Sequence, residues 1–203
     1  MSEWYWLFYI ALFSSMESKI NSSDKVILGI DPGTNIMGYG LISIRKKQIS
    51  LLAMGAINLS KLGDHTLKLQ RIFERISELV KEFKVDEAAI EAPFYGKNAQ
   101  SMLKLGRAQG VAMAAVLNHN VPVKEYMPKK IKKAITGKGA ASKEQVAAML
   151  KSLIRYEETP KTLDATDALA VALCHHYQAG MPSGTKSYSN WESYLKNNPG
   201  RKA

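Results

Sequence analysis

The hydrophobic pattern of this chain changes its period near residue 60, and that change restricts the folds it can adopt. Before this point, three apolar segments of strand length, residues 26–30, 36–45 and 49–59, are separated by short turns. Strands joined in this way form an antiparallel meander. Residues 65–84 then carry apolar side chains at three- and four-residue steps, which is typical of an amphipathic helix.

Beyond that helix, the pattern alternates between strands and helices. Ser142 followed three residues later by Gln145 indicates a capping box at one helix start. The expected strands cover residues 87–91 and 121–126, and the expected helices cover residues 98–117, 129–135, 142–154 and 163–178. This order predicts an α/β fold with a mixed five-stranded sheet, an antiparallel meander plus parallel strands, flanked by helices.

Four acidic residues stand at the ends of apolar segments. Asp31 and Glu91 each end a predicted strand, whereas Asp164 and Asp167 open the last predicted helix. Carboxylates are almost never fully buried unless they are paired or bind a metal. Acids in a first helical turn could simply complement the helix dipole, but that does not account for the two strand ends. We therefore predict that all four acids share one cation site.

The charge balance indicates the kind of partner. The chain has 203 residues and a formal net charge of +10, with 28 Lys and Arg against 18 Asp and Glu. This length suits one domain with a sizeable core. A basic protein of this kind is expected to contact a phosphate backbone. An acidic pocket within it favours a metal-dependent enzyme acting on nucleic acid, and a basic binding protein without chemistry is the alternative.

Five short motifs occur in order between residues 25 and 178. They are Gly29-Ile30-Asp31-Pro32-Gly33-Thr34, Ala89-Ile90-Glu91-Ala92-Pro93-Phe94, Lys97-Asn98, Leu105-Gly106-Arg107-Ala108-Gln109-Gly110 and Asp164-Ala165-Thr166-Asp167-Ala168. Together they resemble the RuvC family of bacterial Holliday-junction resolvases. The resemblance implies a ribonuclease H-like fold, in which acids at the ends of the first and fourth strands face a final acidic helix.

The resemblance also implies an activity, that of a crossover junction endodeoxyribonuclease of DNA recombination and repair. Phosphodiester hydrolysis requires stabilisation of an attacking water, a leaving oxygen and extra charge on phosphorus, and two divalent ions can supply all three. Mg²⁺ prefers hard oxygen ligands. We expect two Mg²⁺ ions per subunit, for which Mn²⁺ could substitute. Their expected ligands, and the catalytic residues, are Asp31, Glu91, Asp164 and Asp167.

Several residues are candidates for contacting DNA. The resemblance favours Phe94, in the loop after Glu91, as a wedge that stacks on unpaired bases at the junction centre. The alternative is a buried anchor for that loop. The expected DNA-binding residues are Phe94, Lys97, Asn98, Arg107, Lys132 and Lys143. The last two are the best candidates for phosphates near the scissile bond, although part of the lysine cluster is a solvated helical face.

Symmetry and family resemblance indicate the partners. A four-way junction has two equivalent strands to cut, so a homodimer with twofold symmetry would present two matching sites. The small-residue helix over residues 98–117 is expected to form much of the interface. By resemblance, the RuvA–RuvB branch-migration complex is a further partner. The single cysteine, Cys174, is expected to be a small buried thiol, which fits a reducing cytoplasm, and we expect no membrane association.

Other functions are also compatible with parts of the sequence. The Asp31-Pro32-Gly33-Thr34 segment resembles the phosphate loop of actin-like ATPases and sugar kinases, but those proteins use two such domains and are normally much longer. A single-domain YqgF-type nuclease acting on RNA is a closer alternative. A non-catalytic basic DNA-binding module is the alternative from a different class. Metal-dependent nicking would separate that module from a nuclease.

Both ends of the chain are expected to lie outside the nuclease domain, which we place at residues 25–179. Residues 1–24 are expected to be an extension, with residues 1–15 arising from a misplaced start codon or serving as a short membrane or partner anchor. Residues 180–203 are expected to form a flexible basic tail. His175 and His176 lie about 16 Å of helix rise beyond Asp164, too far to be ligands, and are expected at the surface or as partners of the helix dipole.

Overall fold

The computed structural model describes residues 24–93, 98–154 and 163–179. Five strands form one sheet in the order β3-β2-β1-β4-β5, so β1 is its central strand. The strands are β1 Lys25–Asp31, β2 Ile36–Arg45, β3 Gln48–Asn58, β4 Glu87–Glu91 and β5 Val123–Tyr126. The predicted mixed sheet is confirmed, and the predicted strand limits agree to within two residues.

The strand directions explain where a site can form. The pairs β1–β2 and β2–β3 are antiparallel, whereas β4 runs parallel to both β1 and β5. The carboxyl ends of β1, β4 and β5 therefore lie at the same edge of the sheet. In open sheets with parallel strands, ligands commonly bind outside this edge.

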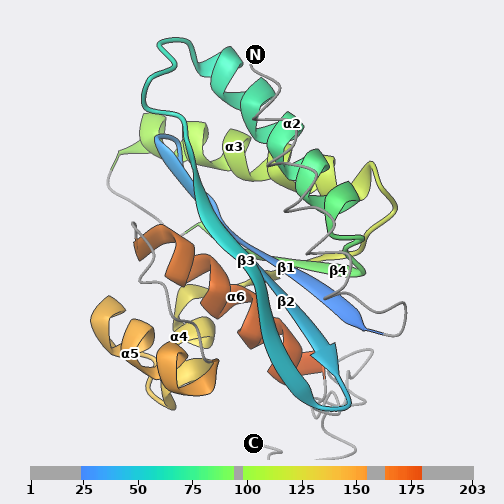
Figure 1. The fold of residues 1–203 in the computed structure, drawn as a ribbon. Coiled ribbons are helices and arrows are strands. Elements are labelled where there is room, and N and C mark those ends of the chain that lie inside the picture. The colour runs from blue at the N-terminus through green and yellow to red at the C-terminus, as the bar shows by residue number, and fades with distance from the viewer. Residues whose placement is uncertain (1–23, 94–97, 155–162, 180–203) are drawn as a thin grey trace, which may run out of the picture.

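Five helices cover the two faces of the sheet. Helices α2 and α3 lie on one face, and α4, α5 and α6 lie on the other (Figure 1). Successive strand residues alternate between the two cores: Leu28 faces α2 and α3, whereas Ile27 faces α6. The helices are α2 His65–Glu82, α3 Ala99–Leu117, α4 Pro128–Thr136, α5 Lys143–Leu153 and α6 Leu163–Ala179.

Local sequence sets the helix ends. The predicted capping box is confirmed: the Ser142 side chain accepts from the Gln145 backbone, and the Gln145 side chain accepts from the Ser142 backbone. The side chain of Asn98 accepts a hydrogen bond from Ser101 N–H and caps α3. Gly137, with a φ of 74°, ends α4 in the left-handed conformation that glycine adopts without strain.

The turn between β2 and β3 has a less favourable sequence. Lys46 and Lys47, with φ of 46° and 74°, are both left-handed, and Arg45 pairs with Gln48 across this two-residue loop. Two left-handed central residues suit the twist of a hairpin, but asparagine and glycine are the residues that favour them. The hairpin therefore contains local backbone strain.

Helix α6 lies unusually close to the sheet because glycines replace side chains beneath it. A Cβ placed on Gly29 would lie 2.2 Å from the Ala168 carbonyl oxygen, and one on Gly38 would lie 2.0 Å from the Asp164 carbonyl oxygen. Neither distance leaves room for a side chain. These two positions therefore fix how closely the first half of α6 approaches β1 and β2.

Other expectations concern residues outside the described ranges. The predicted extension falls almost entirely on residues 1–23, and the predicted tail falls on residues 180–203, so neither is tested. In the described part of the chain, no helix is both long enough and apolar enough to cross a membrane. Cys174 is buried, as predicted.

Candidate active site

Asp31 and Glu91 end the two central parallel strands. Ile30 of β1 is in register with Ile90 of β4, so the acids that follow them are neighbours at the carboxyl edge of the sheet. Both acids are partly buried. The sequence separates them by 60 residues, and the parallel pairing of β1 with β4 brings them together.

Both carboxylates face α6. Ile27 of β1 and Ala89 of β4 pack with residues of α6 in one core cluster. Side chains two or four positions apart on a strand share a face, so Asp31 and Glu91 lie on the same side of the sheet as Ile27 and Ala89. They therefore point toward the helix that carries the other two candidate acids.

The first turn of α6 lies directly over this edge. Gly38 pairs with Asp31 across β1 and β2, and the backbone of Asp164 lies against Gly38. One turn further along the helix, Asp167 reaches a cavity that Asp31 and Glu91 also line. The structure thus brings Asp31, Glu91 and Asp167 together around one cavity. The fourth predicted acid, Asp164, is close enough for its charge to raise the pKa of Asp31.

The cavity has an acidic end and an apolar wall. Its volume is about 80 Å³, which is room for several groups the size of a water molecule. It is lined by Asp31, Glu91, Pro128, Ile131, Lys132, Lys143, Val146, Asp167 and Ala170. The apolar wall was not predicted from the sequence, although the alternation of apolar residues with lysines after Pro128 was the available signal.

The acids strongly perturb one another. Burial, followed by repulsion from Glu91 and Asp167, raises the pKa of Asp31 from 3.8 to about 8. Burial, followed by repulsion from Asp167, raises the pKa of Glu91 from 4.5 to about 7. Such carboxylates favour a bound cation, because a positive charge would relieve both the burial cost and the repulsion.

Lysines partly neutralise the cavity. Lys143 Nζ donates to Asp167 Oδ2 across α5 and α6, and this hydrogen bond raises the pKa of Lys143. Lys143 also lowers the pKa values of Asp31 and Glu91, against the effect of burial. Lys143 was predicted from the sequence to contact phosphate, and its pairing with an acid was missed.

The donor set fits a hard divalent cation. Carboxylate oxygens facing a cavity are the ligands that Mg²⁺ prefers, and Mg²⁺ keeps several waters, so few protein ligands are needed. Among the described residues, no three acidic, histidine or cysteine side chains are already gathered as a metal-binding group. Rotation of Asp167 away from Lys143 would leave its carboxylate free to act as a ligand.

The other predicted site residues have different surroundings. Lys132 lines the cavity, as its predicted role requires. Asn98 is exposed and caps α3, and Arg107 is exposed on the same helix, which covers the opposite face of the sheet from α6. Phe94 and Lys97 lie outside the described residues.

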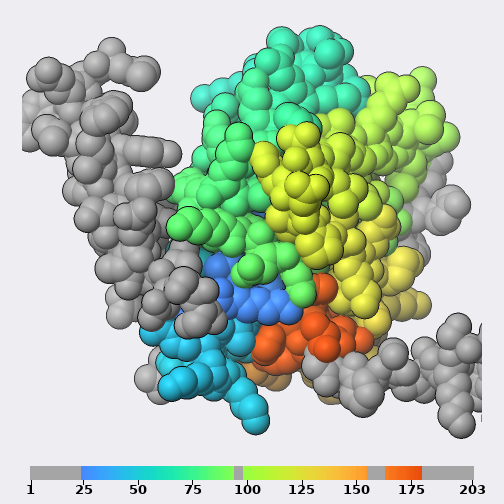
Figure 2. Space-filling model, turned by 90° about the vertical axis from the view of Figure 1, so that its right-hand side faces the viewer, coloured from blue at the N-terminus to red at the C-terminus, as the bar shows by residue number. Residues whose placement is uncertain are grey.

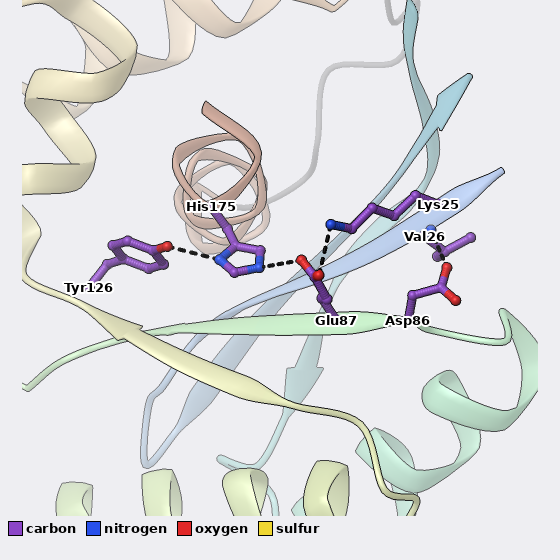
Figure 3. Close-up of polar contacts among 6 residues, drawn as sticks. All are labelled: Lys25, Val26, Asp86, Glu87, Tyr126 and His175. Atoms are coloured by element: carbon purple, nitrogen blue, oxygen red, sulfur yellow. Dashed lines mark hydrogen bonds and ion pairs between the residues drawn. The ribbon is translucent and has the colours of Figure 1, made fainter. Parts of the chain in front are cut away.

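The expectation that His175 lies at the surface is wrong. Only 7% of this residue is exposed, and both ring nitrogens are engaged (Figure 3). Nδ1 lies 2.9 Å from the Tyr126 hydroxyl, and Nε2 lies 2.8 Å from Glu87 Oε2. The physical reason is that α6 is buried on almost all sides, so its seventh to thirteenth residues have no solvent-facing stripe. His176 is partly buried beside it.

Comparisons with known proteins point to one family. A family model described as crossover junction endodeoxyribonuclease RuvC matches residues 27–175. The protein of that name from Cytophaga hutchinsonii is 59% identical over 176 residues, 87% of each chain. The one from Christiangramia forsetii is 57% identical over 185 residues, 91% of this chain and 96% of the relative. The solved structure of T. thermophilus RuvC in complex with a Holliday junction substrate has a TM-score of 0.71 and 31% identity, covering 76% of this chain and 94% of that one.

Proposed function

The chain belongs to the RuvC family of crossover junction endodeoxyribonucleases, and we propose that it resolves four-way DNA junctions by metal-dependent hydrolysis at the carboxyl edge of its sheet. Its fold is the ribonuclease H-like fold of that family. One observation supports the proposed site above all others. The acids that end β1 and β4 line one cavity together with Asp167 of α6 and two lysines.

Each acid has a proposed role at this site. Asp31 and Glu91 would hold Mg²⁺ from the sheet, and Asp164 and Asp167 would hold it from α6. The raised pKa values of Asp31 and Glu91 support this assignment, because bound cations would stabilise both carboxylates in their charged forms. Two divalent ions would activate water and stabilise the charge that develops on the phosphate. Mn²⁺, which accepts the same oxygen ligands, could substitute.

The lysines of the cavity would hold the DNA backbone. Lys132 and Lys143 lie beside the acids, where a scissile phosphate would enter. Lys143 would exchange its contact with Asp167 for a contact with the phosphate when the acid turns to a metal ion. We keep Asn98, Arg107 and Lys97 as proposed contacts further along the DNA. Arg107 is exposed and free to serve this role.

A cleavage assay tests the proposed function. Wild-type protein with Mg²⁺ is expected to cut a synthetic four-way junction in preference to linear duplex and single-stranded RNA. Asp31→Asn and Glu91→Gln should abolish cutting but keep junction binding, because amides preserve shape while removing the charge that holds the cation. Asp64→Asn is the matched control, since Asp64 only caps α2 and asparagine caps equally well.

Three outcomes would contradict the proposal. Cutting of RNA in preference to the junction would indicate a YqgF-type activity, and junction binding without any cutting would indicate a binding module. Near-normal turnover in Asp164→Asn or Asp167→Asn would remove that acid from the proposed metal site.

The loop that follows Glu91 carries a further proposal from the sequence. We propose that Phe94 is the wedge that stacks on unpaired bases, where such stacking is worth about 1–3 kcal/mol per base. Phe94→Ala should then slow junction cleavage more than it lowers the melting temperature. A buried anchor would instead cost about 3–5 kcal/mol of stability, so a large fall in melting temperature would contradict the wedge assignment.

We further propose that the protein acts as a homodimer through α3. Ala108 and Ala112 of α3 are buried in the core, but another stripe of this helix is exposed (Figure 2). Leu103 is 64% exposed, and an added Cβ at Gly106 or Gly110 would meet nothing within 4 Å. This apolar, small-residue stripe is suited to close approach of a second copy.

Sedimentation of the wild-type protein and two variants tests the dimer. Gly110→Glu should produce monomers, whereas Gly63→Glu, at another open position, should not. A monomeric wild-type protein at micromolar concentration would contradict the proposal. We also propose, by family resemblance alone, a cytoplasmic location, a nuclease domain at residues 25–179 and the RuvA–RuvB complex as a partner.

A further inference from the structure

The helix that carries two of the proposed metal ligands has an unusual contact surface. Ten of the residues of α6 are buried, and the positions that face β1 and β2 pack on glycines. Apolar contacts are non-directional, so they favour burial of this helix without strongly selecting its position along the sheet. A directional contact selects that position more sharply than packing alone.

His175 supplies the directional contact. In the described part of the chain, the side-chain hydrogen bonds that join α6 to the sheet are the two made by His175 (Figure 3). One is with Tyr126 on β5, and the other is with Glu87 on β4. Lys25 on β1 pairs with the same Glu87 carboxylate at 2.7 Å, so this network connects α6 to the three strands that run parallel to one another.

The protonation states of His175 and Glu87 determine which atoms donate and which accept the hydrogen bonds of this network. Burial lowers the pKa of His175, and the neighbouring Glu87 only partly opposes this, so the imidazole is neutral near pH 7. Burial would raise the pKa of Glu87, but hydrogen bonds from Lys25 and His175 outweigh it, so Glu87 is ionised. His175 Nε2–H therefore donates to Glu87, and Nδ1 accepts from the hydroxyl of Tyr126.

Both sheet partners of His175 lie next to a proposed ligand. Glu87 is four residues before Glu91 on β4, on the same face of that strand. Tyr126 is in register with Glu91 across β4 and β5, and the next residue of the chain, Ala92, donates its N–H to the Tyr126 carbonyl oxygen at 2.9 Å. Glu87 and Tyr126, the two partners of His175, are thus held in the sheet beside Glu91.

We infer that His175 is a positioning residue for the proposed metal site. Its two hydrogen bonds hold α6 at one place along β4 and β5, and the same helix carries Asp164 and Asp167. A helix moves along its axis as a rigid rod, so a displacement at His175 would reach Asp167, about 12 Å away, undiminished. Mg²⁺ demands near-ideal geometry at about 2.0–2.1 Å, so a shift of a fraction of an ångström would weaken binding.

The inference rests on the proposed function, and Mg²⁺ binding to the full, DNA-free protein tests it without an activity assay. In titration calorimetry, His175→Phe should raise the Kd for Mg²⁺ by at least about tenfold. Losses of this size are typical when a residue that supports metal ligands is replaced. His175→Gln can still donate to Glu87 and should stay within about threefold of wild type. Leu79→Ala, in the core on the opposite face of the sheet, is the control for lost stability.

The outcomes are separable. The inference is supported if His175→Phe and Leu79→Ala lower the melting temperature similarly and only His175→Phe weakens Mg²⁺ binding. It is overturned if His175→Phe binds Mg²⁺ within twofold of wild type, or if Leu79→Ala weakens binding equally. Should His175→Phe not fold, Tyr126→Phe decides, because it removes one hydroxyl and keeps the ring: weaker binding supports the inference, and an unchanged Kd overturns it.

Failure of the proposed function would look different. If Asp31→Asn binds Mg²⁺ as tightly as wild type, the metal site itself is misplaced. If wild type and His175→Phe bind Mg²⁺ alike but Asp31→Asn does not, the metal site stands and the positioning role of His175 fails. Over a range of junction concentrations at fixed Mg²⁺, His175→Phe should also lower kcat and leave KM unchanged, because His175 bonds to Tyr126 and Glu87, neither of which is a proposed DNA-binding residue.

Discussion

Replacing Asp31 with asparagine should stabilise the metal-free protein at neutral pH, even though it removes a proposed ligand. The pKa of Asp31 is raised from 3.8 to about 8, first by burial and then by the neighbouring acids. In the unfolded chain this carboxyl ionises near its ordinary pKa, whereas in the folded protein it stays protonated until about pH 8. The contribution of Asp31 to the stability of the metal-free fold is therefore fully present below about pH 4 and is lost as the pH rises toward 8. Asparagine resembles the protonated acid and avoids this loss.

The size of the effect follows from the pKa difference. A pH of 7 lies about three units above the ordinary pKa of 3.8 and still below the raised pKa, and each unit corresponds to about 1.4 kcal/mol, so the limit is roughly 4 kcal/mol. Relaxation and water entry around a charged carboxylate reduce such values, and we expect Asp31→Asn to gain about 2 kcal/mol at pH 7. At pH 4 the gain should be close to zero.

Urea unfolding in the presence of EDTA, between about pH 4 and pH 8, measures this difference. Asp64→Asn, the same exchange at a helix cap outside the cavity, is the control and should not show the gain expected for Asp31→Asn. Adding Mg²⁺ should make wild type more stable than Asp31→Asn. An ion that binds only the folded state stabilises wild type in proportion to the logarithm of its concentration, whereas the Asp31 variant lacks the site. The reasoning fails if Asp31→Asn is no more stable than wild type at pH 7 without metal, or if Mg²⁺ stabilises both proteins equally.

Three further substitutions test other parts of the structure. Gly29→Ala should cost about 3 kcal/mol in urea unfolding, because the new Cβ would lie 2.2 Å from the Ala168 carbonyl oxygen, whereas Gly63→Ala, at an open position, should change stability little. Lys47→Gly should add about 1 kcal/mol, because it relieves a left-handed φ of 74°, and a loss of stability would contradict the assigned turn. Lys143→Ala should reduce the salt slope of junction binding by about one and slow cleavage, and an unchanged slope would remove Lys143 from the proposed DNA track.

The local part of the fold could be predicted from the sequence because its signals are local. The change from strand to helix periodicity near residue 60, and the capping box from Ser142 to Gln145, each depend on neighbouring residues. The juxtaposition of Asp31 with Glu91 was predictable only through the family resemblance and the expectation of a shared cation site, because their pairing requires a parallel crossover that no local pattern specifies. The extent of the domain and the roles of the individual site residues stay predictions.

The missed features depend on contacts between distant elements. The pairing of Lys143 with Asp167 joins two helices whose relative placement no periodicity specifies. His175 was assigned to the surface on the basis of residue type and its distance from Asp164, and that distance argument says nothing about burial. The unbroken apolar run before it was the better signal, because a helix without a polar face is buried on all sides.

The order of the proposed ligands along the chain has a consequence for synthesis. Asp31 leaves the ribosome first with the antiparallel strands, Glu91 follows after α2, and Asp164 and Asp167 come last on α6. A nascent chain that stops before residue 163 has the strand acids but lacks both helix acids. Truncated products of translation would therefore lack two of the four proposed ligands, and we expect them to leave DNA uncut.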